Sequence, residues 1–519
     1  MSDFYNLLLR YYQISDEKLK ERNKKVTISD LNRPYNLEKF LLVTSRIKKA
    51  IDDKEKIVIY GDYDFDGISS TAIIKRMFDK LSYQVGFFIP SRYKEGYGLK
   101  KERVDQFIIK GYNLIITVDN GVSCNELISY CKSKNVDVVV IDHHVIQEEV
   151  KTPYLFHQND SGFLDYNCSA ASLAYFISSY ILKEDDLYNI TLAGLAVFSD
   201  IMELKGNNLI FAKLALENIN NNTFSNLEAF IYPKKKPYSY DDLSFNIISS
   251  INAVGRVCKD SISTINACRY LLNPDIDDKI KNYFKMIIKA NDEKKKIVSN
   301  FTIDSEINNE YIYCLTTSSF SGLTGLYANK ILKKYNKPTA VFAIDEKNNE
   351  MLVGSIRVNN SYSLLNYLNN PKKYFISSGG HKKAMGITIN KKDYYQFITD
   401  FMLLISSQVK EEEKSITITL DELTLSNYKV YKLFEPFGEG FNKPIFDVIV
   451  KGSDIKKISD KYTCCFSSNN EGKIAYFSSI KEEILKESYY VFKGELNLEK
   501  FNNQEHFTLY ASEYKKESD

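Results

Sequence analysis

The first 150 residues alternate short apolar runs with stretches of helical pattern, and no other feature limits the fold as strongly. The apolar runs are KIVIYG (56–61), VGFFI (85–89), NLIITV (113–118) and VDVVVI (136–141), separated by helical patterns at 69–81, 100–110 and 124–134. Apolar strands spaced by helices indicate a parallel sheet that is covered on both faces. Because ligands bind beyond the carboxyl ends of such strands, the residues after each strand are the first candidates for chemistry.

The rest of the chain divides into further units by its pattern. Apolar residues at helical spacing predict a long amphipathic connector helix over 276–300. A second α/β unit is expected from about 302, the stretch KEEEK (410–414) resembles a solvated hinge, and the short alternating strands after it indicate a small barrel or sandwich. We therefore predict four segments, at 1–257, 258–301, 302–410 and 411–519.

Composition excludes several classes of protein. The 519 residues carry 69 basic and 67 acidic side chains, a net charge of +2. Any binding of nucleic acid must therefore depend on a local cluster of positive side chains. No apolar run approaches about 18 residues, which argues against a membrane span. The first 20 residues lack the basic and apolar regions of a secretory signal. The eight cysteines contain no CxxC and favour a reduced, cytoplasmic setting over a disulfide scaffold or zinc ribbon.

Three aspartates follow the first apolar run, in Gly61-Asp62-Tyr63-Asp64-Phe65-Asp66-Gly67. Carboxylates at i, i+2 and i+4 crowd into one turn, and their charges repel each other strongly in a partly dry site. A divalent cation is the simplest group that offsets this repulsion, and oxygen ligands suit magnesium or manganese. EF-hand loops and plain acidic turns share the pattern, so by itself it leaves those interpretations open.

Acidic and imidazole side chains also follow three later apolar segments. Asp119 ends the third run, Asp142-His143-His144 follows the fourth, and Asp200 follows LAGLAVF (192–198). Each alone is compatible with a turn, a helix cap or a surface pair. Together they fall at one end of the inferred sheet, where a carboxylate next to an imidazole can orient the ring for a metal. The combination predicts two divalent cations, about 3.5–4 Å apart, for hydrolysis at phosphorus.

At this point the sequence resembles the DHH phosphoesterase superfamily and, within it, the RecJ-type exonucleases specific for single strands. The resemblance covers nearly the whole chain and rests on nine segments. These are GDYDFDGISS (61–70), IPSRYKEGYGL (89–99), TVDNGVS (117–123), VIDHHV (140–145), FSDIMELKGNNLIFAKLALE (198–217), INAVGRV (251–257), the pair GSIR (354–357) with SGGHKKAMG (378–386), and LFEPFGEGFNKPIF (433–446).

The resemblance implies a fold and a role for each matched residue. The four segments would be a DHH domain, connector helices, a smaller α/β DHHA1 domain and a β-barrel of the OB-fold type. Asp64, Asp66, Asp119, His143 and Asp200 would be metal ligands, with Asp119 as the bridge, and Asp62 a ligand or close support. Asp142 would orient His143, and His144 would face the scissile phosphate. Phosphates and the strand end would be held by Arg92, Arg256, Ser355, Arg357, Gly379, Gly380 and His381.

Two family positions are changed in this chain. The arginine that precedes the NAxGR turn is Ser250, and the WHxGVxG element reads SFSGLTG (319–325), so its histidine is missing. Neither change affects a predicted metal ligand, but both affect how the substrate is bound and which end of the strand is selected. In the last segment, aromatic residues could stack on bases, although core packing is the simpler role for most of them; they are Tyr462, Phe466, Tyr476, Phe477, Phe501 and Phe507.

The function implied is a Mn²⁺- or Mg²⁺-dependent exonuclease on single-stranded DNA, acting 5′→3′ in DNA repair and recombination. By the same resemblance we expect a cytoplasmic monomer with no membrane contact, whose partners include a single-strand-binding protein and a helicase. Two alternatives stay open at this stage. One is a phosphodiesterase for short oligoribonucleotides or cyclic dinucleotides, which would not need the last segment. The other is a non-catalytic DNA-binding scaffold, which would have lost metal ligands.

Overall fold

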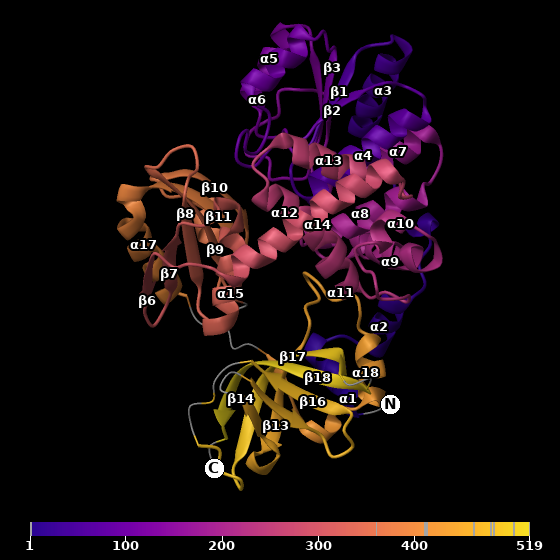
Figure 1. Ribbon diagram of the computed structural model, residues 1–519. Coiled ribbons are helices and arrows are strands. Elements are labelled where there is room, and N and C mark those ends of the chain that lie inside the picture. Colours follow the sequence, from indigo (N-terminus) through magenta and orange to yellow (C-terminus); the bar gives the residue numbers. More distant parts are fainter. Residues whose placement is uncertain are drawn as a thin grey trace.

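The computed structural model describes residues 3–359, 361–408, 414–459, 462–477, 480, 483–501 and 504–517. Its strands form three sheets, and Figure 1 shows the corresponding three regions: the first at the top, the second on the left and the third below. We number the regions by the order of their sheets in the chain. Of the predicted hinge 410–414, only Lys414 lies among the described residues.

The first region is built on a parallel sheet in the order β2-β1-β3-β4-β5. All residues of β1 and β3 are buried, as expected for strands that are covered on both faces. Alternate side chains of β1 enter two different cores, Ile57 and Ile59 in one and Val58 and Tyr60 in the other. The strands are β1 (Ile57–Tyr60), β2 (Gly86–Phe88), β3 (Leu114–Val118), β4 (Asp137–Ile141) and β5 (Leu155–Phe156).

Helices cover both faces of this sheet (Figure 1). Helices α3, α4 and α7 share the larger core, whereas α5 and α6 cover the opposite face. Helix α12 follows directly on a π-helical turn at Leu243–Ile248. The helices are α3 (Glu38–Asp52), α4 (Phe65–Lys80), α5 (Lys101–Ile109), α6 (Asn125–Ser133), α7 (Ala170–Leu182), α8 (Leu187–Ser199), α9 (Gly206–Asn221), α10 (Ser225–Glu228), α11 (Tyr240–Asp242), α12 (Ser249–Val257) and α13 (Ser261–Leu271).

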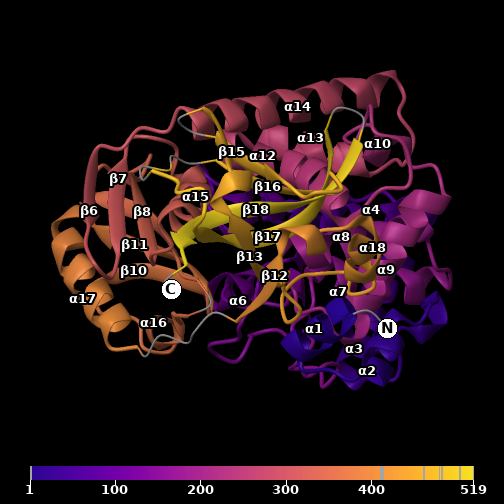
Figure 2. The same ribbon diagram turned by 90° about the horizontal axis from the view of Figure 1, so that it is seen from below.

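A single long helix, α14 (Asp278–Ser299), connects the first region to the second, as the spacing over 276–300 predicted. It packs against α12 and α13 through a stripe that includes Ile280 and Ile287. Figure 2 shows it running along the outside of the molecule toward the second sheet.

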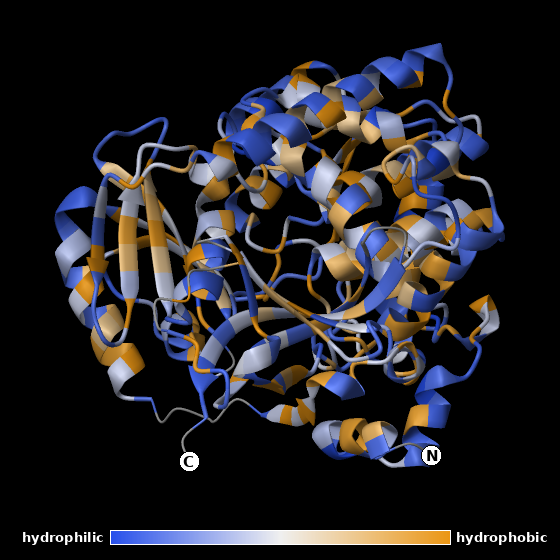
Figure 3. Ribbon diagram, turned by 60° about the horizontal axis from the view of Figure 1, so that its bottom comes forward, coloured by the Kyte–Doolittle hydropathy of each residue, from blue (hydrophilic) through white to orange (hydrophobic). Residues whose placement is uncertain are grey.

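The second region has a mixed sheet in the order β10-β11-β9-β8-β7-β6, in which β7 and β8 are parallel. Hydrophobic residues follow its central strands, and the loops at its ends are hydrophilic (Figure 3). The segment SGGHKK does not form a plain turn: Ser378 to His381 end strand β10, and the two lysines form the hairpin turn. The elements are β6 (Ser305–Asn308), β7 (Tyr313–Thr317), α15 (Thr324–Tyr335), β8 (Thr339–Ile344), β9 (Met351–Arg357), α16 (Leu365–Asn369), β10 (Phe375–His381), β11 (Ala384–Asn390) and α17 (Tyr394–Ser406).

The third region is a seven-stranded sheet in the order β12-β13-β17-β18-β16-β15-β14. Its core includes Phe4, Tyr5 and Leu8, so the N-terminal helix packs here and not on the first sheet. The elements are α1 (Asp3–Tyr12), α2 (Asp16–Asn23), β12 (Ser415–Thr419), α18 (Leu425–Lys432), β13 (Ile445–Lys451), β14 (Lys456–Ser459), β15 (Tyr462–Phe466), β16 (Gly472–Tyr476), β17 (Tyr489–Phe501) and β18 (Gln504–Lys516).

The predicted fold class is confirmed: a parallel α/β region, a connector helix, a smaller α/β region and a C-terminal β region follow one another. The boundaries at 257, 301 and 410 stay predictions. Among the helices that the structure describes, none combines the length and the apolar character needed to cross a bilayer.

Candidate metal centre

The carboxyl edge of the first sheet gathers the predicted acidic residues. β1, β3 and β4 are parallel neighbours, so Asp62, Asp119 and Asp142, which follow them, emerge at the same edge. Asp119 turns there with a φ of +61°, while its main-chain N–H still bonds the carbonyl of Ile141 at 2.9 Å. All three aspartates are buried.

The other two carboxylates of the first motif are placed by the start of α4. Asp64 is the N-cap of that helix and accepts the Gly67 N–H at 3.1 Å. Asp66 is fully buried, and its two oxygens accept the N–H groups of Ala170 and Ala171, at 2.7 and 2.8 Å, where α7 begins. A Cβ at position 67 would lie 2.6 Å from the main chain of Asp62, so this turn requires glycine.

His143 lies at the middle of the acidic cluster. Its Nε2 is 3.1 Å from Oδ1 of Asp119, 3.2 Å from Oδ2 of Asp200 and 3.7 Å from Oδ2 of Asp66. Asp200 reaches the cluster from the C-cap position of α8. Segments as far apart as residues 62 and 200 thus meet at one point, as the sequence analysis expected.

Asp142 contacts a different ring from the one we expected. Its Oδ1 lies 2.8 Å from Nδ1 of His144, and it also accepts the main-chain N–H of His143 at 2.8 Å. The Val122 N–H donates to its other oxygen at 3.1 Å. The prediction that Asp142 orients the ring of His143 is therefore wrong: the first imidazole turns to the cluster, and Asp142 fixes the second.

Carboxylates outnumber positive groups in the cluster: burial opposes the charge of His143, but Asp119 and Asp200 raise the pKa of its imidazole well above the ordinary value. Burial, together with neighbouring carboxylates, raises the pKa values of Asp62, Asp66 and Asp119 well above the ordinary value. Burial also opposes the ionisation of Asp142, yet its bond to His144 and the nearby imidazoles lower its pKa to about 2. Three buried carboxylates with raised pKa values release their protons readily only if a cation replaces them.

The donor atoms fit divalent cations. Three groups of side chains place their ligand atoms within 4.8 Å of one another: Asp62, Asp64 and Asp119; Asp66, Asp119, His143 and Asp200; Asp119, Asp142, His143 and His144. Asp119 belongs to all three groups, which suits a bridge. In the described part of the chain, Oδ1 of Asp62 and Nδ1 of His143 are buried without a hydrogen-bond partner. Buried oxygen and imidazole donors of this kind match Mn²⁺ or Mg²⁺.

Three predicted phosphate-binding arginines converge beside the acidic cluster. The Arg92 guanidinium lies 4.2 Å from the ring centre of Tyr63 and donates to the Gly255 carbonyl at 3.2 Å. Arg256 donates across to the Gly322 carbonyl of the second region at 3.2 Å. Burial, followed by the charges of Arg92 and Arg357, lowers the pKa of Arg256 to about 10, so the guanidinium groups lie close enough to repel each other.

The second region contributes its predicted residues from two strands. Ser355 and Arg357 lie on β9, and a Cβ added to Gly325 would approach both, at 3.4 and 2.7 Å. Gly379, Gly380 and His381 end β10 and are exposed. Burial opposes the ionisation of Asp200, but His143, His144 and His381 lower its pKa. The end of β10 is therefore near enough to the acidic cluster for the charge of His381 to act on it.

At the two changed family positions, the side chains contact neighbouring elements. Ser250 is buried and accepts a hydrogen bond from Asn291 of α14 at 3.0 Å. Phe320 packs edge-on against Tyr93, with ring centres 6.0 Å apart, and the Lys259 ammonium lies 4.8 Å from its ring centre. Both changes tie the first region to its neighbours.

Sequence reasoning missed Tyr97, Asn252 and His157. The Tyr97 hydroxyl lies 3.1 Å from Nδ1 of His144, and the His157 Nε2 lies 2.9 Å from the His144 carbonyl. Asn252 accepts the Phe65 N–H at 2.8 Å and so holds the start of α4. Tyr97 and Asn252 stand inside quoted motifs, but no spacing rule indicates which chemistry they support, and His157 stands outside those motifs.

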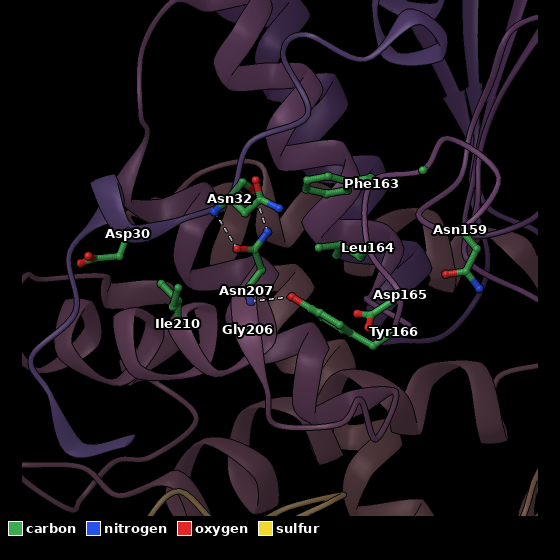
Figure 4. A pocket seen from close by; sticks show the side chains of 11 residues that line it. Asp30, Asn32, Asn159, Phe163, Leu164, Asp165, Tyr166, Gly206, Asn207 and Ile210 are labelled. Carbon is green, nitrogen blue, oxygen red and sulfur yellow. Dashed lines mark hydrogen bonds between the residues drawn. The ribbon is translucent and has the colours of Figure 1, made fainter. Parts of the chain in front are cut away.

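A cavity of about 760 Å³ is lined by residues outside the acidic cluster. Figure 4 shows Asn207 in its wall, bonded through its side chain to the backbone of Asn32 and through its N–H to the Tyr166 hydroxyl. Next to the lining residue Asn159, Gln158 donates to the His143 carbonyl at 3.1 Å. The loop beside the cavity thus supports the main chain of the acidic cluster.

Comparison with family models identifies two domains. Residues 56–198 match the model of the DHH family, N-terminal domain, and residues 309–410 match the DHHA1 domain. The first match contains Asp62, Asp119 and both histidines of the cluster. The second contains Ser355, Arg357 and the end of β10.

Comparison with individual proteins finds relatives that are named as single-stranded-DNA-specific exonucleases. The chain is 26% identical over 510 residues to the single-stranded-DNA-specific exonuclease RecJ of Bacillus subtilis, covering 92% of this chain and 63% of that protein. It is 25% identical over 482 residues to the protein of the same name from Haemophilus influenzae, covering 85% and 82%. The fold matches the crystal structure of RecJ with Mn²⁺ from Thermus thermophilus with a TM-score of 0.79 at 18% identity, covering 99% of this chain and 76% of that one.

Proposed function

For a chain whose residues 56–198 form a DHH domain and whose residues 309–410 form a DHHA1 domain, we propose metal-dependent hydrolysis of single-stranded DNA from its 5′ end. One observation carries the proposal: a buried cluster that fits two divalent cations lies beside three arginines that form no ion pair among the described residues, although the charges of Asp62 and Asp64 act on Arg92. The relatives named as single-stranded-DNA-specific exonucleases support the choice of substrate.

The metal ligands in this proposal are Asp64, Asp66, Asp119, His143 and Asp200, with Asp119 shared and Asp62 as a further ligand or support. Bound there, two Mn²⁺ or Mg²⁺ ions would supply an activated water and neutralise charge on the phosphate. Asp66 is held by two N–H groups of α7, so its orientation is fixed before any ion binds.

His144 is proposed to face the scissile phosphate. Its Nδ1 is held by Asp142, and its side chain keeps 43% of its surface exposed, so Nε2 is free for substrate. A protonated ring in this position donates to a phosphate oxygen while the ionised Asp142 stabilises its charge. Tyr97, beside the same ring, restricts its rotation.

The arginines are proposed to hold the phosphate at the 5′ end. Arg92 and Arg256 come from the first region, and Ser355 and Arg357 come from the second, so an anion bound among them contacts both regions. Guanidinium groups bind phosphate oxygens in a bidentate geometry without reading the base. Gly379, Gly380 and His381 would line the path to the metal cluster.

The third region favours a long strand over a dinucleotide. On its sheet the rings of Tyr462, Phe477 and Tyr510 stack in sequence, with centres 4.9 and 6.5 Å apart, and the side chain of Phe477 is 66% exposed. Such rings stack on bases of any sequence. Tyr476 and Phe507 are core residues, Phe466 packs on His506, and the side chain of Phe501 lies outside the described residues.

A time course on labelled strands tests the function. With Mn²⁺, we expect a 5′-phosphorylated strand of about 30 nucleotides to lose mononucleotides from its 5′ end, and EDTA to stop the reaction. A 5′-labelled strand should release its label at once, and a 3′-labelled strand should shorten gradually. Faster turnover of dinucleotides than of the long strand would favour the small-substrate phosphodiesterase, and DNA binding without hydrolysis would favour the scaffold.

Metal binding should stabilise the protein, and more so at higher pH. The raised pKa values of Asp62, Asp66 and Asp119 mean that the metal-free fold holds protons more tightly than the unfolded chain. The metal-free protein therefore loses stability as pH rises above the pKa that these carboxyl groups have in the unfolded chain, while the ion-bound state does not. At a free Mn²⁺ concentration of 100 times Kd, one site contributes about 2.7 kcal/mol.

Thermal unfolding with and without Mn²⁺ at pH 5.5 and pH 8 measures this effect. We expect a larger gain in Tm at pH 8. An equal gain at both values would contradict the assignment of the ligands to carboxylates with raised pKa. The cytoplasmic setting, the monomeric state, the role in DNA repair and recombination, and the protein partners stay predictions.

A further inference from the structure

Asp200 is placed differently from the other carboxylates of the cluster. Asp62, Asp119 and Asp142 follow buried strands, whereas Asp200 begins a connection of residues 200–205 between α8 and α9, which we call the Asp200 loop. Ile201 in this loop has a φ of +53° and is 63% exposed. Within the first region the loop is held by the Met202 N–H on the Val197 carbonyl, at 2.9 Å, and by Asn208 on the Glu203 carbonyl, at 3.0 Å.

Further contacts of the Asp200 loop come from the third region. Residues 436–441, PFGEGF, form a tight turn that leads into its sheet, and we call this the docking turn. The Leu204 N–H donates to the Glu439 carbonyl at 2.9 Å. A Cβ at Gly438 would lie 2.8 Å from Cδ1 of Leu204. A Cβ at Gly440, where φ is +78°, would lie 2.7 Å from Cγ of Glu203, so the turn approaches the loop as closely as glycine permits.

Arg22, from α2, joins these two segments. Its Nη1 donates to the Leu204 carbonyl at 3.2 Å, and its Nη2 donates to the Pro436 carbonyl at 2.8 Å. The same guanidinium lies 4.0 Å from the ring centre of Phe441. One planar group thus contacts the Asp200 loop on one side and the docking turn on the other, a geometry that only arginine provides.

We propose that Arg22 is a positioning residue for the metal centre, because it fastens the Asp200 loop to the docking turn and so holds the Asp200 carboxylate in place. The third region then contributes to metal binding as well as to the path of the strand. This inference rests on the proposed role of Asp200 as a metal ligand. Groups that orient metal ligands typically change metal affinity by about 10–100-fold when they are removed.

Arg22→Gln tests the inference, with Mn²⁺ binding to the full-length protein as the main readout. We expect the Kd for Mn²⁺ to rise about 10-fold. We also expect kcat on a 5′-phosphorylated tetranucleotide to fall with little change in KM, because so short a substrate does not depend on the third sheet. Arg22→Lys, which keeps one of the two carbonyl contacts, should recover part of the Mn²⁺ affinity.

Arg33→Gln is the matched control. Arg33 also ties the N-terminal segment to the first region, through Asp185 at 2.9 Å and the Tyr35 hydroxyl at 2.7 Å, but it does not contact the Asp200 loop. It should lower Tm and leave the Kd for Mn²⁺ unchanged. A loss of Mn²⁺ affinity that merely follows global stability would appear in both variants and would overturn the inference.

A second variant keeps the test decisive if Arg22→Gln does not fold. Gly440→Ala places a Cβ against Glu203 at a positive φ, so it should displace the docking turn and raise the Kd for Mn²⁺ as well. If either variant folds and binds Mn²⁺ with wild-type affinity, this inference is overturned and the proposed metal centre is not. Failure of the wild-type protein to bind Mn²⁺ would instead overturn the proposed metal centre.

Discussion

Replacement of Asp119 by asparagine is expected to lower kcat by about 1,000-fold, which corresponds to about 4 kcal/mol of activation free energy. Asp119 is shared by all three candidate ligand groups, and its Oδ1 lies 3.1 Å from the His143 imidazole. Loss of its charge therefore weakens both proposed cation positions at once. No neighbouring carboxylate can take over, because the others already belong to single groups or are held by main-chain N–H groups.

The same substitution should leave the metal-free fold at least as stable as the wild type. Asparagine has nearly the same shape as aspartate and tolerates the φ of +61° at this position. It removes a buried carboxylate whose ionisation is opposed by burial and by Asp66 and Asp64. Breaking up a buried cluster of like charges relieves repulsion, so Tm without metal should be unchanged or higher.

Activity and Tm, measured side by side, separate chemistry from folding. Asp165→Asn makes the same chemical change at an exposed site that lines the large cavity, and it should behave as the wild type in both assays. Retention of more than about a tenth of the wild-type kcat by Asp119→Asn, a loss under about 1.4 kcal/mol, would contradict a bridging role.

The sequence was sufficient to predict most of the acidic cluster, because local rules determine where Asp62, Asp119 and Asp142 lie. A buried strand must end in a loop at the carboxyl edge, and adjacent parallel strands place those loops together. Asp62, Asp119 and Asp142 follow β1, β3 and β4 for that reason. Asp200 does not follow a strand, and its place in the cluster depends on how α8 packs. Its inclusion rested on the apolar run before it and on the family resemblance.

The partner of Asp142 could not be predicted from spacing. His143 and His144 are adjacent, and either ring can reach a carboxylate at the preceding residue. Tertiary contacts decide between the two rings. Asp119 and Asp200 contact Nε2 of His143, and Asp142 contacts Nδ1 of His144. Rotamers at such positions follow from partners more than 20 residues away, which a local pattern does not contain.

The core against which the N-terminal helix packs could not be predicted from the sequence pattern either. Phe4, Tyr5 and Leu8 give α1 an apolar face, but an apolar face does not specify which core it joins. In the structure it joins the third sheet, more than 400 residues later in the chain. The link from α2 to the docking turn through Arg22 depends on this placement, so no local pattern indicated it.

Replacement of Arg256 by glutamine is expected to raise KM for a 5′-phosphorylated strand by about 30-fold, equivalent to about 2 kcal/mol of binding. Arg256 lies among Arg92 and Arg357, and burial together with their charges lowers its pKa to about 10. Burial and mutual repulsion oppose the charges of these guanidinium groups, so an anion that binds among them is favourable. A terminal phosphate, with up to two negative charges, suits this position better than an internal phosphodiester with one.

The comparison of two strand ends makes this prediction specific. A strand with a 5′ hydroxyl lacks the dianion, so its KM should change much less than that of the phosphorylated strand. The slope of log KM against log salt concentration should also fall by about 0.7 for the lost phosphate contact. Arg269→Gln, at an exposed position on α13 where the side chain bonds Asn266, is the control for loss of one positive charge.

An equal rise in KM for both strand ends would contradict the assignment. It would mean that Arg256 acts on the strand as a whole or through the domain contact to Gly322, which lies 3.2 Å from its Nη1. Arg256→Lys discriminates further, because lysine keeps the charge but loses the planar pair of donors. If end recognition depends on bidentate geometry, Arg256→Lys should recover the salt dependence and not the preference for the 5′ phosphate.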